Sequence, residues 1–254
     1  MDAKTIVVTG SAKPGYGEAI TRRLLREGFT VLGTYGSDDS EHAELLRKEL
    51  THTGRLHLSL VDHASRSSLK AFVQAISGTI HGLVNAQFFF DLEDPDNFDH
   101  DVWDKSIAVN LTAPNFLIHE LSKAFVGGSS IVIITSTEGF IGSFGASAYA
   151  ATKAAIHNLV KSLANNLGPK NIRINAIAAG WIGGVMDTDE IFNMSRRITP
   201  LGRLGSSEEI AAVTYFLLSN ESSFVNGTVI TADGGYTGVD TIAKYEFEQS
   251  RLKK

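Results

Sequence analysis

The strongest constraint on the fold is an alternation of apolar, β-branched runs with helical patterns. Runs typical of strands cover residues 5–9, 29–35, 56–61, 80–86, 131–135, 171–177 and 228–231. Helical patterns lie between most of these runs, because apolar residues recur there three and four positions apart. A strand, a helix and a further strand form the repeating unit of a parallel sheet. The sequence therefore predicts an α/β fold with one doubly wound parallel sheet and helices on both faces.

Length and composition fit one domain of this kind. The chain has 254 residues, of which 43% are hydrophobic, and this is enough for a single core. A net charge of -5 and a pI near 5.9 give no basic surface for nucleic acid or anionic lipid. Cysteine is absent, and no apolar run approaches the ~18 residues of a membrane span. We expect a single cytoplasmic domain over residues 1–254 without nucleic-acid or membrane partners.

Two segments stand outside the alternation. Residues 185–205 lack strong periodicity and are predicted to form a mobile flap. Ser206 is followed three residues later by Glu209, a capping-box pattern that predicts the start of the next helix. The tail over residues 236–254 is polar and charged, and its pattern predicts no particular structure.

The first predicted turn carries three glycines. Gly10, Gly15 and Gly17 follow the strand over residues 5–9 and precede a helical pattern. Glycines let the backbone approach a pyrophosphate, and the helix N-terminus supplies amide donors and a favourable dipole. The turn therefore indicates a dinucleotide site.

A serine, a tyrosine and a lysine surround the turn after the strand over residues 131–135. Tyr149 and Lys153 are four positions apart, so on a helix they would share one face. A cation beside the phenol would lower its pKa from about 10 toward working pH. Tyr149 is then a candidate general acid and base, with Ser136 thirteen residues before it. Taken alone, the pair is also common on exposed helix faces.

Over residues 4–238 these features resemble the short-chain dehydrogenase/reductase family. The motifs that carry the resemblance are Thr9-Gly10 with Gly15 and Gly17, Asp62, Leu83-Val84-Asn85-Ala86, Asn110, Ser136, Tyr149 with Lys153, residues 172–175 with Ala179-Gly180, residues 202–205, and Asp233-Gly234-Gly235. The chain is most similar overall to 3-oxoacyl-carrier-protein reductases. The resemblance implies a Rossmann domain that interconverts a carbonyl and a secondary alcohol, assembled as a homodimer or homotetramer.

The resemblance also implies roles for four catalytic residues. Tyr149 would protonate the carbonyl oxygen as hydride arrives, and Lys153 would lower the pKa of Tyr149 and hold the nicotinamide ribose. Ser136 would bond the substrate oxygen, and Asn110 would hold a water in the relay to Lys153. Two alternatives stay open, a non-redox relative of the halohydrin-dehalogenase type and a catalytically silent nucleotide-binding regulator. Lys153 argues against the first, since that group carries arginine at this position.

A nicotinamide dinucleotide is the implied cofactor. The residues expected to bind it are Gly10, Ser11, Lys13, Gly15, Tyr16, Gly17, Tyr35, Asp62, His63, Asn85, Ala86, Tyr149, Lys153, Gly180 and Ile182. NAD-specific relatives place an acid at the end of the second strand, where this chain has Tyr35. Because no acid stands there and Lys13 offers a cation, NADP(H) is predicted over NAD(H).

The chain departs from the family pattern at three places. The glycine turn is one residue longer than usual, and Ala179-Gly180-Trp181 replaces the usual Pro-Gly motif. Phe88 stands where a glycine normally lets the cofactor pass.

The substrate is expected to bind at the carboxyl ends of the strands, against Ser136 and Tyr149. Candidates for an apolar pocket are Phe88, Phe144 and Trp181, with Phe89, Phe90, Phe140, Ile182 and Met186 as further choices. Each of these side chains could equally pack in the core or in a dimer contact. An aromatic pocket favours a hydrophobic small-molecule carbonyl or alcohol. The histidines have no metal-ligand spacing, so no metal is expected.

Overall fold

The computed structural model describes residues 3–184 and 188–252, and its centre is a seven-stranded sheet in the order β3-β2-β1-β4-β5-β6-β7. The strands are β1 (Thr5–Thr9), β2 (Thr30–Tyr35), β3 (Leu56–Leu60), β4 (Ile80–Asn85), β5 (Phe125–Ser136), β6 (Arg173–Ala179) and β7 (Val229–Ala232). Every neighbouring pair is parallel. The predicted fold class, a doubly wound parallel sheet, is confirmed.

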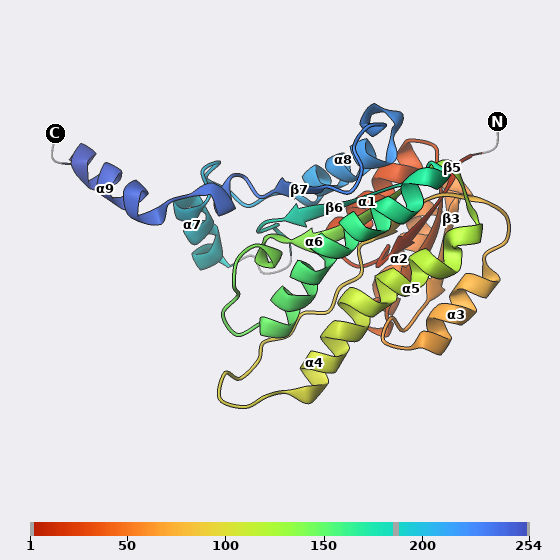
Figure 1. The fold of residues 1–254 in the computed structure, drawn as a ribbon, viewed down its shortest axis with the longest axis horizontal. Coiled ribbons are helices and arrows are strands. Elements are labelled where there is room, and N and C mark those ends of the chain that lie inside the picture. Colours follow the sequence, from red (N-terminus) through yellow and green to blue (C-terminus); the bar gives the residue numbers. More distant parts are fainter. Residues whose placement is uncertain (1–2, 185–187, 253–254) are drawn as a thin grey trace.

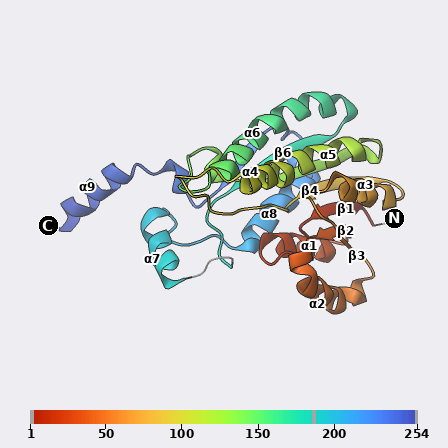
Figure 2. The same ribbon diagram turned by 90° about the horizontal axis from the view of Figure 1, so that it is seen from below.

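Helices cover both faces of the sheet (Figures 1 and 2). They are α1 (Tyr16–Arg26), α2 (Ser40–Leu50), α3 (Arg66–Ala75), α4 (His100–Ser106), α5 (Ala113–Glu120), α6 (Ser147–Leu167), α7 (Asp189–Ile198), α8 (Ser207–Leu218) and α9 (Thr241–Leu252). A π-helical segment, Ile107–Thr112, joins α4 to α5. The predicted capping box at the start of α8 is present, because Ser206 and Glu209 each bond the other's backbone N–H.

The two faces of the sheet bury separate apolar clusters. Along β1, Val7 points to the cluster formed with α3, α5 and α6, while Ile6 and Val8 point to the cluster formed with α1 and α8. This division follows from the strand geometry, because successive side chains of a strand point to opposite faces.

Five apolar residues on the helices around the site have one clear location. They are Leu117, Leu121, Ile156, Val160 and Leu163, and from the sequence alone each could pack either on the sheet or on a second copy of the chain. All five are buried within the chain in the cluster beneath α5 and α6. They pack on the sheet.

One predicted boundary is wrong. The sequence predicts a helix over residues 101–125, but α5 ends at Glu120, a 3-10 turn follows over Leu121–Lys123, and Phe125 already begins β5. Phe125 pairs with Ile80, and this pairing extends β5 to twelve residues, well beyond the five predicted. The apolar pattern could not separate the end of a buried helix from the start of a buried strand.

Helices also form in the two segments without a predicted structure. Helix α7 lies within residues 185–205, of which 185–187, including Met186, are outside the described residues. Helix α9 lies in the tail and projects away from the sheet (Figure 1). Phe192 of α7 and Ile242 of α9 are exposed. Within the described residues, no helix is long and apolar enough to cross a membrane.

Three loops come together where the carboxyl ends of the strands meet. Strands β2 and β3 lie on one side of β1, and β4 to β7 lie on the other. In such sheets ligands bind outside the carboxyl ends of the strands at this switch point. The loops that follow β1, β4 and β5 all begin there.

Candidate active site

Ser136, Tyr149 and Lys153 come together at the carboxyl ends of the strands. Ser136 is the last residue of β5, and its hydroxyl lies close enough to Tyr149 on α6 to favour the ionised phenol. Lys153 lies one turn further along α6, with Nζ 5.1 Å from the centre of the Tyr149 ring. Its ammonium group donates to the backbone oxygen of Ile134 at 3.3 Å. The spacing read from the sequence therefore produces the expected cluster.

The electrostatics of Tyr149 differ from the expectation. Burial raises the pKa of Tyr149, and the negative charge of Glu138 raises it further. The nearby Ser136 hydroxyl acts on this pKa in the opposite direction and more weakly. The prediction that the pKa of Tyr149 is lowered is therefore wrong for the protein by itself. Tyr149 is strongly held in its protonated form.

The state of Lys153 explains this result. Lys153 is only 3% exposed, and burial lowers its pKa to about 7, against the opposing pull of Glu138. Lys13 lowers the pKa of Lys153 as well. A lysine that is largely neutral above pH 7 cannot stabilise a phenolate that forms at higher pH.

Asn110 fixes the loop that follows β4. It lies in the π-helical segment, is 2% exposed, and accepts from the backbone N–H of Phe89 at 2.8 Å. Its Nδ2 group donates to the oxygen of Phe89 at 2.9 Å and to Oγ1 of Thr152 at 3.3 Å. Thr152 lies next to Lys153 on α6, so Asn110 joins the β4 loop to the helix that carries Tyr149.

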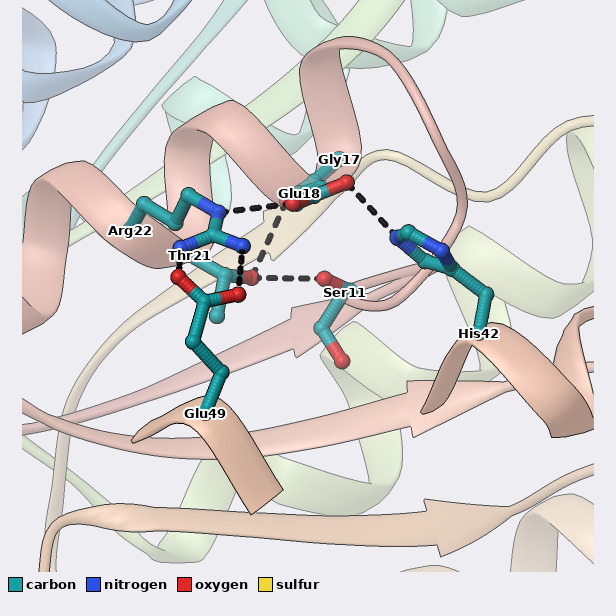
Figure 3. Close-up of polar contacts among 7 residues, drawn as sticks. All are labelled: Ser11, Gly17, Glu18, Thr21, Arg22, His42 and Glu49. Carbon is teal, nitrogen blue, oxygen red and sulfur yellow. Dashed lines mark hydrogen bonds and ion pairs between the residues drawn. The ribbon is translucent and has the colours of Figure 1, made fainter. Parts of the chain in front are cut away.

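The glycine turn after β1 is closely packed. A Cβ atom on Gly17 would lie 2.1 Å from the oxygen of Gly10, so no larger residue fits there. Gly15 has φ of 106°, in the region that favours glycine. The Thr21 hydroxyl lies within donating distance of two backbone oxygens, those of Ser11 and Gly17, each at 3.0 Å. It therefore joins the turn to α1 (Figure 3). The predicted glycine turn is therefore present, and its binding of a pyrophosphate stays a prediction.

A charged network beside this turn joins α1 to α2. Glu18 contacts Arg22 at 2.6 Å and His42 at 2.7 Å (Figure 3). Arg22 also forms two hydrogen bonds with Glu49, at 2.7 and 2.6 Å. The network holds α2 against the helix that starts at the glycine turn.

Three further residues that the sequence assigns to the cofactor, at the ends of β2 and β3, lie in different environments. Tyr35 packs against the small cluster beneath α2, and its hydroxyl bonds Arg47. Asp62 is exposed and accepts from the N–H of Ala64 at 2.9 Å. The His63 ring is buried and lies 3.1 Å from Oγ1 of Thr34. Asp38, in the 3-10 turn Ser37–Asp39 after β2, is a second exposed carboxylate near these strand ends.

Asn85 and Ala86 stand at the end of β4, beside the glycine turn. Asn85 is buried and pairs with Thr9 at 3.3 Å, while its Nδ2 group has no partner within the described residues. The N–H of Ala86 donates to Oγ1 of Thr9 at 3.2 Å. An unpartnered buried donor at this place fits a ligand with oxygen acceptors.

Gly180 and Ile182, which the sequence assigns to the cofactor, follow the end of β6. Gly180 packs so tightly on Asp233 that a Cβ atom would lie 2.7 Å from it. Ile182 forms a bridge with Gly205. No cluster of three or more histidine, cysteine, aspartate or glutamate side chains within residues 3–184 and 188–252 could hold a metal ion.

The chain matches a family model described as enoyl-(acyl carrier protein) reductase over residues 10–237. It is 33% identical to a 3-oxoacyl-[acyl-carrier-protein] reductase of Thermotoga maritima, over 92% of this chain and 98% of the relative. It belongs to the short-chain dehydrogenase/reductase family. An L-rhamnose 1-dehydrogenase (NADP(+)) of Thermoplasma acidophilum is 30% identical, over 91% and 95% of the two chains. A solved blue fluorescent protein from a metagenomic library, in complex with NADPH, is 27% identical, with TM-score 0.86 over 92% and 98%.

Phe88 of this short-chain dehydrogenase/reductase lies near two lysines. Its ring centre lies 4.3 Å from Nζ of Lys13 and 5.8 Å from Nζ of Lys153. The ring of Tyr16 lies 5.8 Å away on the same side of the turn. Phe88 therefore stands between the cation of the glycine turn and the lysine of α6, both of which the sequence assigns to the cofactor.

The expected apolar pocket is only partly assembled in this family member. Phe90 packs edge-on against Tyr149, with ring centres 5.2 Å apart. Phe144 is fully exposed, and Trp181 is 44% exposed. Phe140 packs on His157 with ring centres 4.3 Å apart. Of the aromatic candidates, Phe88 and Phe90 are therefore the ones that contact Tyr149 or Lys153.

Two acids of this dehydrogenase/reductase site were missed by sequence reasoning. Glu93 caps α6, because its carboxylate accepts from the Ser147 hydroxyl at 3.0 Å and from the Ala148 N–H at 2.9 Å. The sequence holds one indication that the cap comes from elsewhere, because Ala146, the residue before α6, has no side-chain acceptor for the free N–H groups of the helix. Glu138 follows Ser136 by two residues, and its negative charge raises the pKa of both Tyr149 and Lys153. No local pattern indicates that contact.

Proposed function

We propose that the protein is an NADP(H)-dependent carbonyl reductase and secondary-alcohol dehydrogenase, with Tyr149 as its general acid and base. The family membership supports an oxidoreductase. The observation that carries the finer proposal is the placement of Ser136 at the end of β5 beside a half-buried Tyr149 on α6, one helical turn from Lys153. In its protonated form Tyr149 can give a proton to a carbonyl oxygen, but its raised pKa makes it a weaker acid than a general acid with a pKa near the working pH.

Each residue of the cluster then has a distinct task. Ser136 donates to the substrate oxygen and orients it toward the Tyr149 hydroxyl. Tyr149 transfers its proton to that oxygen during reduction and recovers it during oxidation. The nicotinamide supplies or takes up the hydride. Lys153 would bind the ribose hydroxyls through Nζ when the cofactor is present, and Asn110 links the loop after β4 to α6.

The residues around the glycine turn fit a phosphorylated dinucleotide. The turn offers a tightly closed backbone at the start of α1, where amide donors and the helix dipole favour a phosphate. Lys13 adds a cation, and Tyr35 replaces the acid that would repel a 2′-phosphate. The names of the relatives support the same preference, because one is an NADP(+) enzyme and one was solved with NADPH.

The substrate is proposed to be a small carbonyl compound with an apolar part. Phe90 lies edge-on against Tyr149, so an apolar group beside the reacting oxygen would contact its ring. Phe144 and Trp181 are exposed on the neighbouring loops and are available to cover such a group.

The test compares wild type with Tyr149→Phe and Tyr245→Phe, using NADPH and a panel of ketones. Loss of the general acid should lower kcat/KM at least ~100-fold in Tyr149→Phe. Tyr245 is 63% exposed on α9, so its variant should keep wild-type activity. Activity of Tyr149→Phe within a few-fold of wild type contradicts the mechanism. NADPH binding without turnover on any ketone points to a silent regulator, and at least tenfold tighter NADH binding contradicts the cofactor preference.

A further inference from the structure

Gln87 lies against the first glycine of the turn after β1. It follows the last residue of β4 by two positions, and its backbone N–H donates to Oγ1 of Thr9 at 3.2 Å. A Cβ atom on Gly10 would lie 2.9 Å from Oε1 of Gln87 and 3.0 Å from its Cα, so Gln87 packs closely on Gly10. The sequence assigns Gly10 to the cofactor, whereas it assigns no role to Gln87.

The carboxamide of Gln87 has one bonded atom and one unpartnered atom. Its Nε2 group donates to the backbone oxygen of Phe88 at 3.4 Å. Because a carbonyl oxygen bonds only a donor, this contact places Nε2 at Phe88 and Oε1 at the glycine turn. Oε1 is buried there and has no hydrogen-bond partner among the residues that the structure describes. A buried acceptor without a donor destabilises the protein unless a ligand supplies that donor.

Asn85 holds a second unpartnered atom beside the same turn. Asn85 is 3% exposed and pairs with Thr9 across the sheet, and its Oδ1 accepts from the Thr9 hydroxyl at 3.3 Å. Its Nδ2 donor has no partner in the described part of the chain. Oγ1 of Thr9 thus bonds both Asn85 and the backbone of Gln87. One free donor and one free acceptor therefore belong to two residues that the same hydroxyl holds.

The chemistry of these two atoms indicates the group that they would bind. A deprotonated phosphate oxygen carries no proton, so it cannot bond Oε1 of Gln87. A hydroxyl donates one hydrogen bond and accepts others, so it can bond both Oε1 of Gln87 and Nδ2 of Asn85. NADP(H) carries free hydroxyls on both of its riboses, on either side of the pyrophosphate that the turn is proposed to bind. A ribose hydroxyl therefore matches the pair.

We propose that Gln87 is a further cofactor-binding residue, whose Oε1 accepts a hydrogen bond from a ribose hydroxyl of NADP(H). Asn85 supplies the complementary donor through Nδ2. The acceptor that lacks a partner in the free protein gains one when the cofactor binds. The inference rests on the nicotinamide cofactor of the proposed function and is independent of the proton transfer assigned to Tyr149.

The first experiment measures NADPH binding by calorimetric titration, so it needs no turnover. Gln87→Met has nearly the same length but no amide, and it should weaken binding about fivefold, as expected for one lost hydrogen bond. Gln74→Met changes an exposed glutamine of α3 and should bind as wild type does. Equal affinities of Gln87→Met and wild type would contradict the role of Gln87 alone. A wild-type protein that binds no NADPH would overturn the proposed function as well.

Three smaller probes identify the group that Gln87 contacts. Inorganic pyrophosphate has no ribose, adenosine 2′,5′-bisphosphate carries one ribose of the cofactor, and nicotinamide mononucleotide carries the other. Gln87→Met should bind pyrophosphate as wild type does and should bind one of the two nucleotides more weakly, and that nucleotide identifies the ribose. Weaker binding of pyrophosphate would show that Gln87 contacts phosphate and would contradict the proposal, as would unchanged binding of both nucleotides.

Unfolding in urea without cofactor separates this role from a structural one. Gln87→Met removes a buried acceptor that has no partner in the free protein, so its urea midpoint should equal or exceed that of wild type. A glutamine that mainly stabilised the loop after β4 would give a lower midpoint together with weaker NADPH binding. That combination would overturn the proposal.

Discussion

Asn110 and Phe89 hold each other by two hydrogen bonds, one in each direction. The Phe89 N–H donates to Oδ1 of Asn110 at 2.8 Å, and Nδ2 of Asn110 donates to the Phe89 oxygen at 2.9 Å. An asparagine side chain thus pairs with a loop backbone as a neighbouring strand would. The pairing fixes the position of Phe88 and Phe90, the two rings that flank Lys153 and Tyr149.

Replacing Asn110 by alanine should loosen this loop. Both backbone groups of Phe89 lose their partner, and such a loss costs roughly 1–3 kcal/mol. We expect a matching fall in the free energy of unfolding in urea and faster amide exchange over residues 87–92. Asn97→Ala is the control, because Asn97 is exposed and bonds only Asp94. Equal urea midpoints for Asn110→Ala and wild type would contradict this account.

Replacing Glu93 by alanine should destabilise the first turn of α6. The Ser147 hydroxyl and the Ala148 N–H lose their acceptor, and Ala146 cannot replace it. A lost helix cap costs about 1 kcal/mol. Unfolding in urea and amide exchange at the first turn of α6 measure the effect, with Asp91→Ala as the control from the same loop. Glu93→Gln retains one acceptor and should fall between wild type and Glu93→Ala.

Replacing Phe88 by alanine should strengthen NADPH binding. The ring contacts the cations of Lys13 and Lys153, which the cofactor is proposed to use. Removing a contact worth about 1 kcal/mol corresponds to roughly fivefold tighter binding. Calorimetric titration measures the Kd, and Phe224→Ala, which changes a fully exposed ring, is the control. Weaker binding in Phe88→Ala would show that the ring supports the cofactor and does not compete with it.

Much of the fold could be predicted because its signals are local. The strand runs, the glycine turn and the capping box at Ser206 each lie within a few residues of chain, and β1 and α8 form as expected. Helices α7 and α9 could not be predicted in the same way. Phe192 of α7 and Ile242 of α9 remain exposed, so these helices do not pack a buried apolar face against the sheet as α1 and α8 do.

The site also has features that local sequence predicts and features that it does not. The geometry of Tyr149 and Lys153 follows from four positions on a helix, and the sequence is enough to place them on one face. The pKa of Tyr149 depends on burial and on Glu138, while the cap on α6 comes from Glu93 in a distant loop. These effects arise only when separate segments fold together, and the expected lowering of the pKa of Tyr149 was wrong for that reason.

His63 should make the protein lose stability as the pH falls. Burial lowers its pKa from 6.5 to about 4 in the folded chain, and its ring lies against Thr34. Between pH 6.5 and pH 4 the unfolded chain therefore binds a proton at this residue that the folded chain does not. Stability from this source is complete above pH 6.5 and declines by roughly 3 kcal/mol by pH 4. Urea unfolding of wild type and His63→Gln across this range isolates the effect, since the variant should show the shallower decline. His52→Gln, at an exposed position, should follow wild type, and parallel curves for wild type and His63→Gln would refute the prediction.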